Sequence, residues 1–124
     1  MEAKVDHFAN VVVIAIEGRI DHSTAPAFGS AILPHVEGCA GETKKLLIDM
    51  SKVTYISSAG LRVLMIAAKG CRKQDGNVVL AGLQPTVSEV FKIGRFDKVF
   101  TVFETVYAGL VALSPEAAAA FSAR

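Results

Sequence analysis

The first twenty residues have the hydrophobic pattern of a β-hairpin. Apolar and polar side chains alternate over residues 3–7, and a turn-like segment, 8–10, leads into a β-branched run at 11–16. β-Branched side chains favour strands, and an apolar run without alternation indicates a strand buried on both faces. We therefore expect two adjacent strands here, the second of them ending near Gly18.

A helix is expected after this hairpin. Thr24 is a candidate N-cap, and Pro26 falls in the first helical turn, where its missing amide hydrogen needs no intrahelical partner. Pro34 falls too late for that turn. Because an interior proline removes a backbone hydrogen bond and clashes with the preceding turn, the helix must kink or end near Leu33.

A third strand and a second helix follow. The apolar segment 46–48 predicts a buried strand that stops at Asp49, and residues 50–56 are expected to form a loop. From Ser58 onward, apolar and basic side chains separate onto two stripes at helical spacing, which predicts an amphipathic helix that ends at residues 75–77. The apolar stripe holds Leu61, Leu64, Met65 and Ala68, and the basic stripe holds Arg62, Lys69, Arg72 and Lys73.

The remaining segments alternate in the same way. Residues 78–81 predict a strand, 84–94 a short helix that ends at its glycine, 100–103 a last strand and 104–113 a last helix. The alanine-rich tail, 114–124, is helix-competent but marginal.

This order of elements predicts an α/β fold in one domain. Residues 1–124 contain no linker or internal repeat, so we expect a single domain with its core at about 3–113 and a mixed β-sheet that combines an N-terminal hairpin with successive βα units. The predicted core side chains are Val13, Ile14, Leu47, Ile48, Leu64, Val79 and Phe91.

Composition excludes several classes of function. Hydrophobic residues make up 52% of the chain and charged residues 20%, with a net charge of +1, so neither disorder nor nucleic-acid binding is expected. The longest apolar run is far shorter than the ~20 residues that span a bilayer, and no signal segment opens the chain, which predicts a cytoplasmic protein without direct membrane insertion. Cys39 and Cys71 form no zinc or disulfide motif, and we interpret them as apolar core residues.

No catalytic or cofactor motif occurs either. The chain lacks a nucleophile elbow, a phosphate-cradling glycine loop and a paired-carboxylate pattern, so an enzyme is not expected. His7, His22 and His35 have no metal-ligand spacing, and neither a metal nor a cofactor is predicted.

Two polar loops are expected to meet. Strands joined through a helix are nearly always parallel, so the strand before Asp21 and the strand before Ser57 and Ser58 should end on one rim. One of the two serines is a natural N-cap for the helix that follows, and Asp21 is either a turn residue or a contact for a partner. Phosphate on a serine at that helix start would change the charge of the rim.

Three segments resemble the signature segments of bacterial anti-sigma-factor antagonists, which are STAS domains. They are residues 21–25, 49–56 and 57–61, and the resemblance extends over residues 5–113. In that family the central turn reads Asp-Ser-Ser-Gly or Asp-Ser-Thr-Gly. Here Ser57 stands at the aspartate position and Ala59 at the second hydroxyl position.

The resemblance implies a phospho-switch. Ser58 matches the serine that accepts phosphate in that family. The resemblance also implies a partner-binding surface, which consists of Asp21, Ser57, Ser58, Gly60 and Arg62. The implied partners are an anti-sigma-factor serine kinase of the histidine-kinase-like ATPase type, which the unphosphorylated domain sequesters, and a PP2C-type phosphatase. Two alternatives remain open, namely an accessory subunit of a membrane transporter and an unmodified scaffold or ligand-sensing module of a signalling complex.

Overall fold

A computed structural model of the protein describes residues 1–40 and 44–124, which form one mixed β-sheet flanked by helices. Within these residues no helix is long and apolar enough to cross a membrane. The elements, in chain order, are β1 (Glu2–Phe8), β2 (Val11–Ile20), α1 (Ala25–Val36), β3 (Lys45–Ile56), α2 (Ser58–Arg72), β4 (Val78–Ala81), α3 (Pro85–Ile93), the 3₁₀ turn η1 (Phe96–Lys98), β5 (Thr101–Phe103), α4 (Val106–Leu113) and α5 (Pro115–Ala123).

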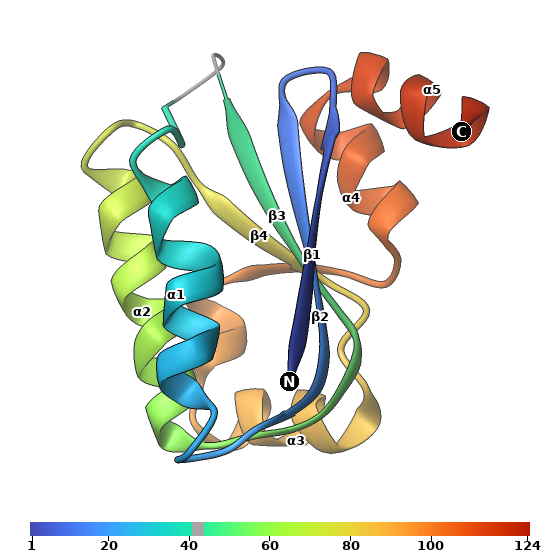
Figure 1. Ribbon diagram of the computed structural model, residues 1–124. Coiled ribbons are helices and arrows are strands. Elements are labelled where there is room, and N and C mark those ends of the chain that lie inside the picture. The colour runs from blue at the N-terminus through green and yellow to red at the C-terminus, as the bar shows by residue number, and fades with distance from the viewer. Residues whose placement is uncertain (41–43) are drawn as a thin grey trace.

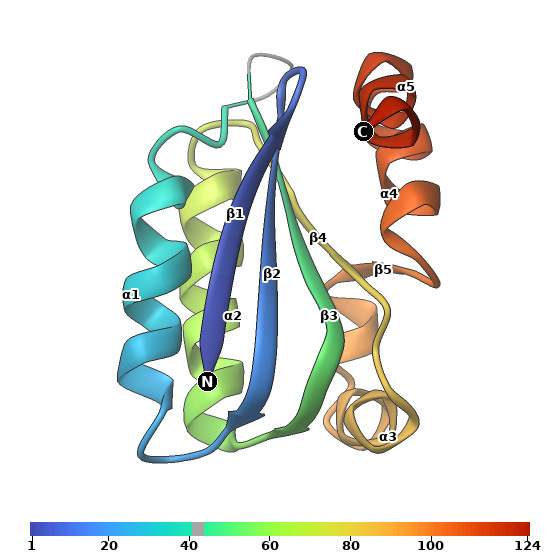
Figure 2. The same ribbon diagram turned by 45° about the vertical axis from the view of Figure 1, so that its right-hand side comes forward.

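The sheet has the order β1-β2-β3-β4-β5. Strand β1 pairs with β2 in antiparallel fashion, and the other pairs are parallel, as expected for a hairpin followed by βα units. Helices α1 and α2 cover one face of the sheet, whereas α4 and α5 lie on the opposite face (Figures 1 and 2). The observed architecture is the expected α/β fold with a mixed sheet.

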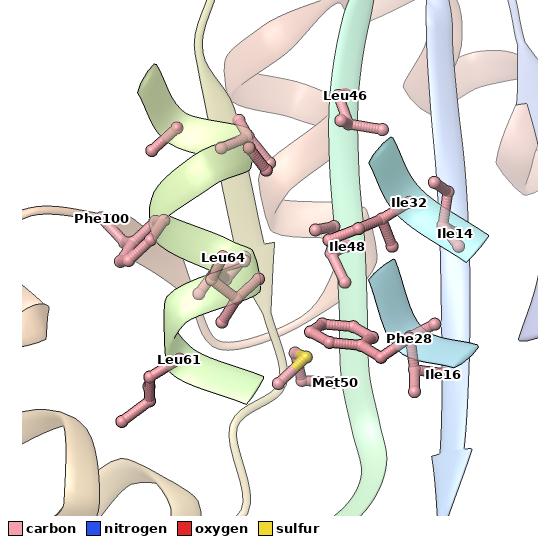
Figure 3. Packing of buried hydrophobic residues seen from close by; sticks show 14 of the residues in the cluster. Ile14, Ile16, Phe28, Ile32, Leu46, Ile48, Met50, Leu61, Leu64 and Phe100 are labelled. Carbon is pink, nitrogen blue, oxygen red and sulfur yellow. The ribbon is translucent and has the colours of Figure 1, made fainter. Parts of the chain in front are cut away.

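The core divides into two apolar layers, one on each face of the sheet. All seven side chains that the sequence assigns to the core are buried. Ile14, Ile48, Leu64 and Phe91 belong to the larger layer, beneath α1 and α2, and Figure 3 shows the first three of these with Phe28 and Ile32 of α1. Val13, Leu47 and Val79 belong to the smaller layer, with Leu110 of α4.

The two central strands are longer than the sequence pattern predicts. Strand β3 does not stop at Asp49 but runs through residues 50–56, so the expected loop is wrong, and β2 continues past Gly18 to Ile20. The reason is two register shifts, between Ala15 and Glu17 and between Gly18 and Arg19, where β3 carries an extra residue. A bulge interrupts the two-residue period by which a strand is recognised.

Helix α1 continues through Pro34 and ends at Val36, so it does not end near Leu33. Pro34 lies two residues before the last one and lacks the amide hydrogen that would bond to the carbonyl oxygen four residues earlier. The Gln74 side-chain amide donates to the Val36 carbonyl oxygen at 2.8 Å, and the Val36 side chain is itself buried. Tertiary contacts therefore hold the last turn in place despite the proline.

The alanine-rich tail forms α5, whose first turn is capped by the Ser114 hydroxyl, an acceptor for the Ala117 amide at 3.3 Å. Ala117 and Ala118 are buried. The ring of Phe121 meets that of Phe8 edge to face, with centroids 5.3 Å apart. The tail thus packs on the β1–β2 turn, opposite α1 and α2 (Figure 2).

Candidate functional site: the rim formed by the ends of β2 and β3

The ends of β2 and β3 lie side by side, as the sequence predicts. Ile20 and Ile56 are paired in the parallel register, and the Ser57 amide donates to the Ile20 carbonyl oxygen at 2.8 Å. The connections that follow, from β2 to α1 and from β3 to α2, run together at the bottom of Figures 1 and 2. Asp21 and Ser57 therefore come directly after two hydrogen-bonded strand ends.

The two adjacent serines have different roles. Ser57 is the N-cap of α2: its backbone is extended, and its hydroxyl accepts a hydrogen bond from the Gly60 amide at 3.2 Å. Ser58 is the first helical residue. Its side chain is exposed, and it makes no hydrogen bond with any of the described residues. Ser57 thus has a structural hydroxyl, whereas the hydroxyl of Ser58 is open to an external reagent.

Asp21 organises the turn before α1. Its Oδ1 atom accepts hydrogen bonds from the Ser23 hydroxyl at 2.8 Å and from the amides of Ser23 and Thr24, both at 3.0 Å. The hydrogen bond from the Ser23 hydroxyl, followed by that from the Thr24 amide, lowers the pKa of the Asp21 carboxyl below its ordinary value. Its other oxygen, Oδ2, has no hydrogen-bond partner among the described residues and is available on the rim.

Thr24 precedes α1 as expected, but its hydroxyl does not cap the helix. Instead, Thr24 Oγ1 lies 2.8 Å from the Arg19 carbonyl oxygen and accepts from the Asp21 amide at 2.8 Å. Thr24 is thus the N-cap residue of α1, as the sequence predicts, but its side chain makes no capping hydrogen bond. Asp21 supplies the acceptor for the Thr24 amide, and the Ala25 amide donates to the Asp21 carbonyl oxygen at 2.9 Å.

We expect the charge of Asp21 to stabilise the fold above the ordinary pKa of its carboxyl. A carboxyl whose pKa is lowered in the folded state contributes stability above its unfolded pKa, and that contribution is lost as the pH falls through the folded value. The Asp21→Asn variant keeps an acceptor at Oδ1 and loses only the charge. Urea unfolding should show wild type more stable than Asp21→Asn at neutral pH, with a difference that shrinks below pH ~4. A difference that does not change with pH would contradict this.

Gly60 is buried under the start of α2. A Cβ atom at this position would lie 2.6 Å from Ile20 Cγ2 and 2.9 Å from Ile56 Cγ1, closer than carbon atoms approach in proteins. The absent side chain lets the first turn of α2 rest on the last residues of β2 and β3. Among the expected rim residues, Gly60 therefore sets the position of Ser57 and Ser58 and offers no side chain of its own.

Arg62 is the one basic side chain in the first two turns of α2. It is exposed, and it forms no ion pair with the described residues. It follows Ser58 by four residues, which places the two side chains on one face of the helix. The structure therefore brings Arg62 to the same surface as the open Ser58 hydroxyl.

Two features of this region were not anticipated. The Arg19 guanidinium lies 4.5 Å from the centroid of the Tyr55 ring, because the bulges of β3 bring Tyr55 opposite Arg19. A shallow groove also runs between α1 and α2 from His22 and Ala59 at the rim to Glu37. The two-residue period is interrupted at both bulges, so the sequence carries no signal for the first feature.

The chemistry open to this rim is modification or contact. A hydroxyl becomes a strong nucleophile when a neighbouring base accepts its proton. No described side chain accepts a hydrogen bond from Ser58, so the structure places no base beside this hydroxyl within the described residues. The carboxylate of Asp21 and the guanidinium of Arg62 add one charge of each sign to the same end of the molecule.

Comparisons with known proteins agree on one family. The model of the STAS domain matches residues 2–109. The chain is 33% identical over 102 residues to BtrV of Bordetella bronchiseptica, whose name assigns it to the anti-sigma factor antagonists; this covers 82% of the chain and 85% of BtrV. It is 32% identical over 100 residues to the anti-sigma-F factor antagonist RsfB of Mycobacterium tuberculosis, with 81% and 79% covered.

A solved structure gives the same result in three dimensions. An anti-sigma factor antagonist from Mycobacterium paratuberculosis superposes with a TM-score of 0.78 at 26% sequence identity, covering 90% of this chain and 92% of that one. The sequence and structure comparisons thus both find anti-sigma factor antagonists that resemble this chain over most of its length.

Proposed function

This chain belongs to the STAS domain family, and on that premise we propose that it acts as an anti-sigma factor antagonist controlled by phosphorylation of Ser58. In this proposal the unmodified domain sequesters an anti-sigma factor that is also a serine kinase, so that a sigma factor is released. The kinase transfers the γ-phosphoryl group of ATP to Ser58 Oγ, ADP leaves, and the hydroxyl proton passes to a base of the kinase. A PP2C-type phosphatase later removes the phosphate by hydrolysis.

The observation that carries this proposal is that the hydroxyl groups of the two adjacent serines have different environments. Ser57 holds the helix start through its hydrogen bond with the Gly60 amide, whereas Ser58 keeps an exposed hydroxyl without a partner among the described residues. Aspartate and serine are both good N-caps. Ser57 therefore fills the capping role that the family's aspartate is able to fill, while the acceptor position next to it remains a serine.

Phosphate at Ser58 would act on binding through charge. A phosphoserine carries about −1.5 to −2 charges near neutral pH, and a docked surface would have to strip water from that group. Asp21, with its open Oδ2, is proposed as a second contact on the rim. Two carboxylate or phosphate groups on one small surface would repel an acidic partner, and unmodified Ser58 would not.

The proposal predicts that the partner kinase labels Ser58. We expect mass spectrometry after incubation with ATP and the kinase to place one phosphate on Ser58, and fragment ions can separate it from the adjacent Ser57. The Ser58→Ala variant should lose labelling and keep binding in titration calorimetry. Ser58→Asp should bind more weakly, although one carboxylate carries less charge than phosphate.

Ser57→Ala is the matched control, because it removes the neighbouring hydroxyl and leaves the acceptor. It should still be labelled, with a stability loss of about 0.5–2 kcal/mol from the lost cap. Phosphate on Ser57 in the wild type would show that the acceptor has moved by one residue. Tight binding without any phosphate would overturn the switch and leave an unmodified scaffold.

A further inference from the structure

The outer face of α2 carries an exposed row that begins at the proposed phosphorylation site. Its members lie at helical spacing and point away from the core: Ser58, Arg62, Ile66, Lys69 and Lys73. Ile66 is 51% exposed, which is unusual for a large aliphatic side chain. The row therefore combines an apolar centre with cations on both sides and one hydroxyl at its start.

The charge of this row is not balanced locally. From Ser58 to Lys73 the chain has four basic residues and no acidic one, although the whole protein has 13 basic and 12 acidic residues. The one ion pair between described residues, Lys4 with Asp6, lies on β1. Arg62 is thus a cation near the start of α2 without a carboxylate to bind among the described residues.

The position of Arg62 relative to Ser58 is favourable for an ion pair. Side chains four residues apart are neighbours on a helix, and long side chains tend to lean toward the N-terminus, so the Arg62 guanidinium is able to reach back over the turn that holds Ser58. Ser57 is five residues away and its hydroxyl is engaged with the Gly60 amide. A guanidinium also offers two parallel donors that match the oxygens of a phosphate.

We infer that Arg62 is the ligand of a phosphate on Ser58, which it binds through its guanidinium once that residue is modified. The inference rests on the proposed function, which supplies the phosphate on Ser58. It adds that this phosphate then binds the Arg62 side chain. Modification then changes the row twice: it adds an anion at Ser58, and it withdraws Arg62 from the cations that flank Ile66. An acidic partner surface would then lose its attraction to Arg62 and would also be repelled by the phosphate on Ser58.

Other ionisable groups on the rim do not replace Arg62 in this role. Asp21 repels a phosphate, and His22 lies with Ala59 on the groove between α1 and α2. Both groups remain in place when Arg62 or Lys69 is changed. Their effects on the phosphate are therefore the same in every variant below and cancel in the comparison.

The test uses full-length protein in which phosphoserine is inserted at position 58 during translation, so no kinase is needed. Phosphorus NMR then gives the second pKa of the phosphate, which is near 6 for phosphoserine. A paired guanidinium favours the dianion and lowers this pKa. Arg62→Gln should therefore raise it, by roughly 0.3–0.7 for an exposed pair, and 1 M salt should reduce the difference.

Lys69→Gln is the matched control, since it removes a cation of the same row that lies about 16 Å from Ser58 along the helix axis, beyond the screening length at ordinary salt. It should leave the pKa unchanged, and Arg62→Lys should restore part of the shift. Equal pKa values in Arg62→Gln and Lys69→Gln would overturn the inference. Such a result would not affect the outcome of the kinase labelling experiment at Ser58. Conversely, if the kinase did not label Ser58, the pKa measurement on the protein with inserted phosphoserine would still be valid.

Discussion

Replacing Leu47 with alanine is expected to lower the free energy of unfolding by about 2–5 kcal/mol. Leu47 is fully buried near the start of β3, in the apolar layer beneath α4. Its Cδ1 atom would lie 2.7 Å from a Cβ added at Gly109, which shows how closely α4 approaches it. Truncation removes buried apolar surface and leaves a cavity that the backbone of α4 is poorly placed to fill. Urea unfolding followed by circular dichroism measures the loss.

Val111→Ala is the control for this prediction. Val111 lies on α4 as well, but its side chain is 47% exposed. We expect a change within about 0.5 kcal/mol, the usual range for a surface substitution. If Leu47→Ala cost no more than Val111→Ala, the α4 layer would not be packed on β3 as described.

The second large effect is expected from Gly60→Ala. The added methyl group would lie 2.6 Å from Ile20 Cγ2 and 2.9 Å from Ile56 Cγ1, and both isoleucines are buried. Either the isoleucines shift or the first turn of α2 moves outward, and overpacking of this kind costs about 1–3 kcal/mol. Amide chemical shifts at Ser57 and Ser58 should move with the helix start, so NMR reports the displacement and urea unfolding reports the cost.

Gly29→Ala is the matched control, because Gly29 is also a helical glycine in the α1–α2 layer. Its added Cβ would meet its nearest neighbours, Leu33 and Val63, at ordinary contact distances of 3.7 Å. Alanine is a better helix former than glycine, so this variant should be as stable as wild type or up to about 1 kcal/mol more stable. Equal losses in the two variants would argue against a special close approach at Gly60.

Much of the fold follows from local patterns that tertiary contacts do not disturb. Residues 78–81 form a strand and 85–93 a helix at the expected positions, since an apolar run, a proline at the first turn and a terminal glycine all agree there. The rim could also be placed in advance. Parallel pairing of β2 with β3 is enough to bring Asp21 and Ser57 together.

The remaining differences come from contacts between distant segments. Residues 50–56 resemble a loop in sequence because their partner is β2, about 35 residues earlier, and the pairing contains bulges. Helix α1 continues past Pro34, and the side chain of Gln74, just after the end of α2, donates a hydrogen bond to the carbonyl oxygen of its last residue. At the site, the sequence is compatible with either serine as the cap of α2. The hydrogen bond from the Gly60 amide to Ser57 Oγ shows that Ser57 is the cap.

The bulged half of β3 has a consequence for which insertions and deletions the chain can accept. Met50, Val53 and Ile56 are buried at intervals of three residues, while Ser51 and Thr54 bind Gln84 and Thr86 of the α3 region only through their backbone carbonyls. Exchanging the exposed side chains of this segment therefore leaves those contacts intact. Removing a single residue would turn Ile56 away from the core and shift Ser57 and Ser58 by one position. Among homologues, the length of this segment should accordingly vary less than its composition.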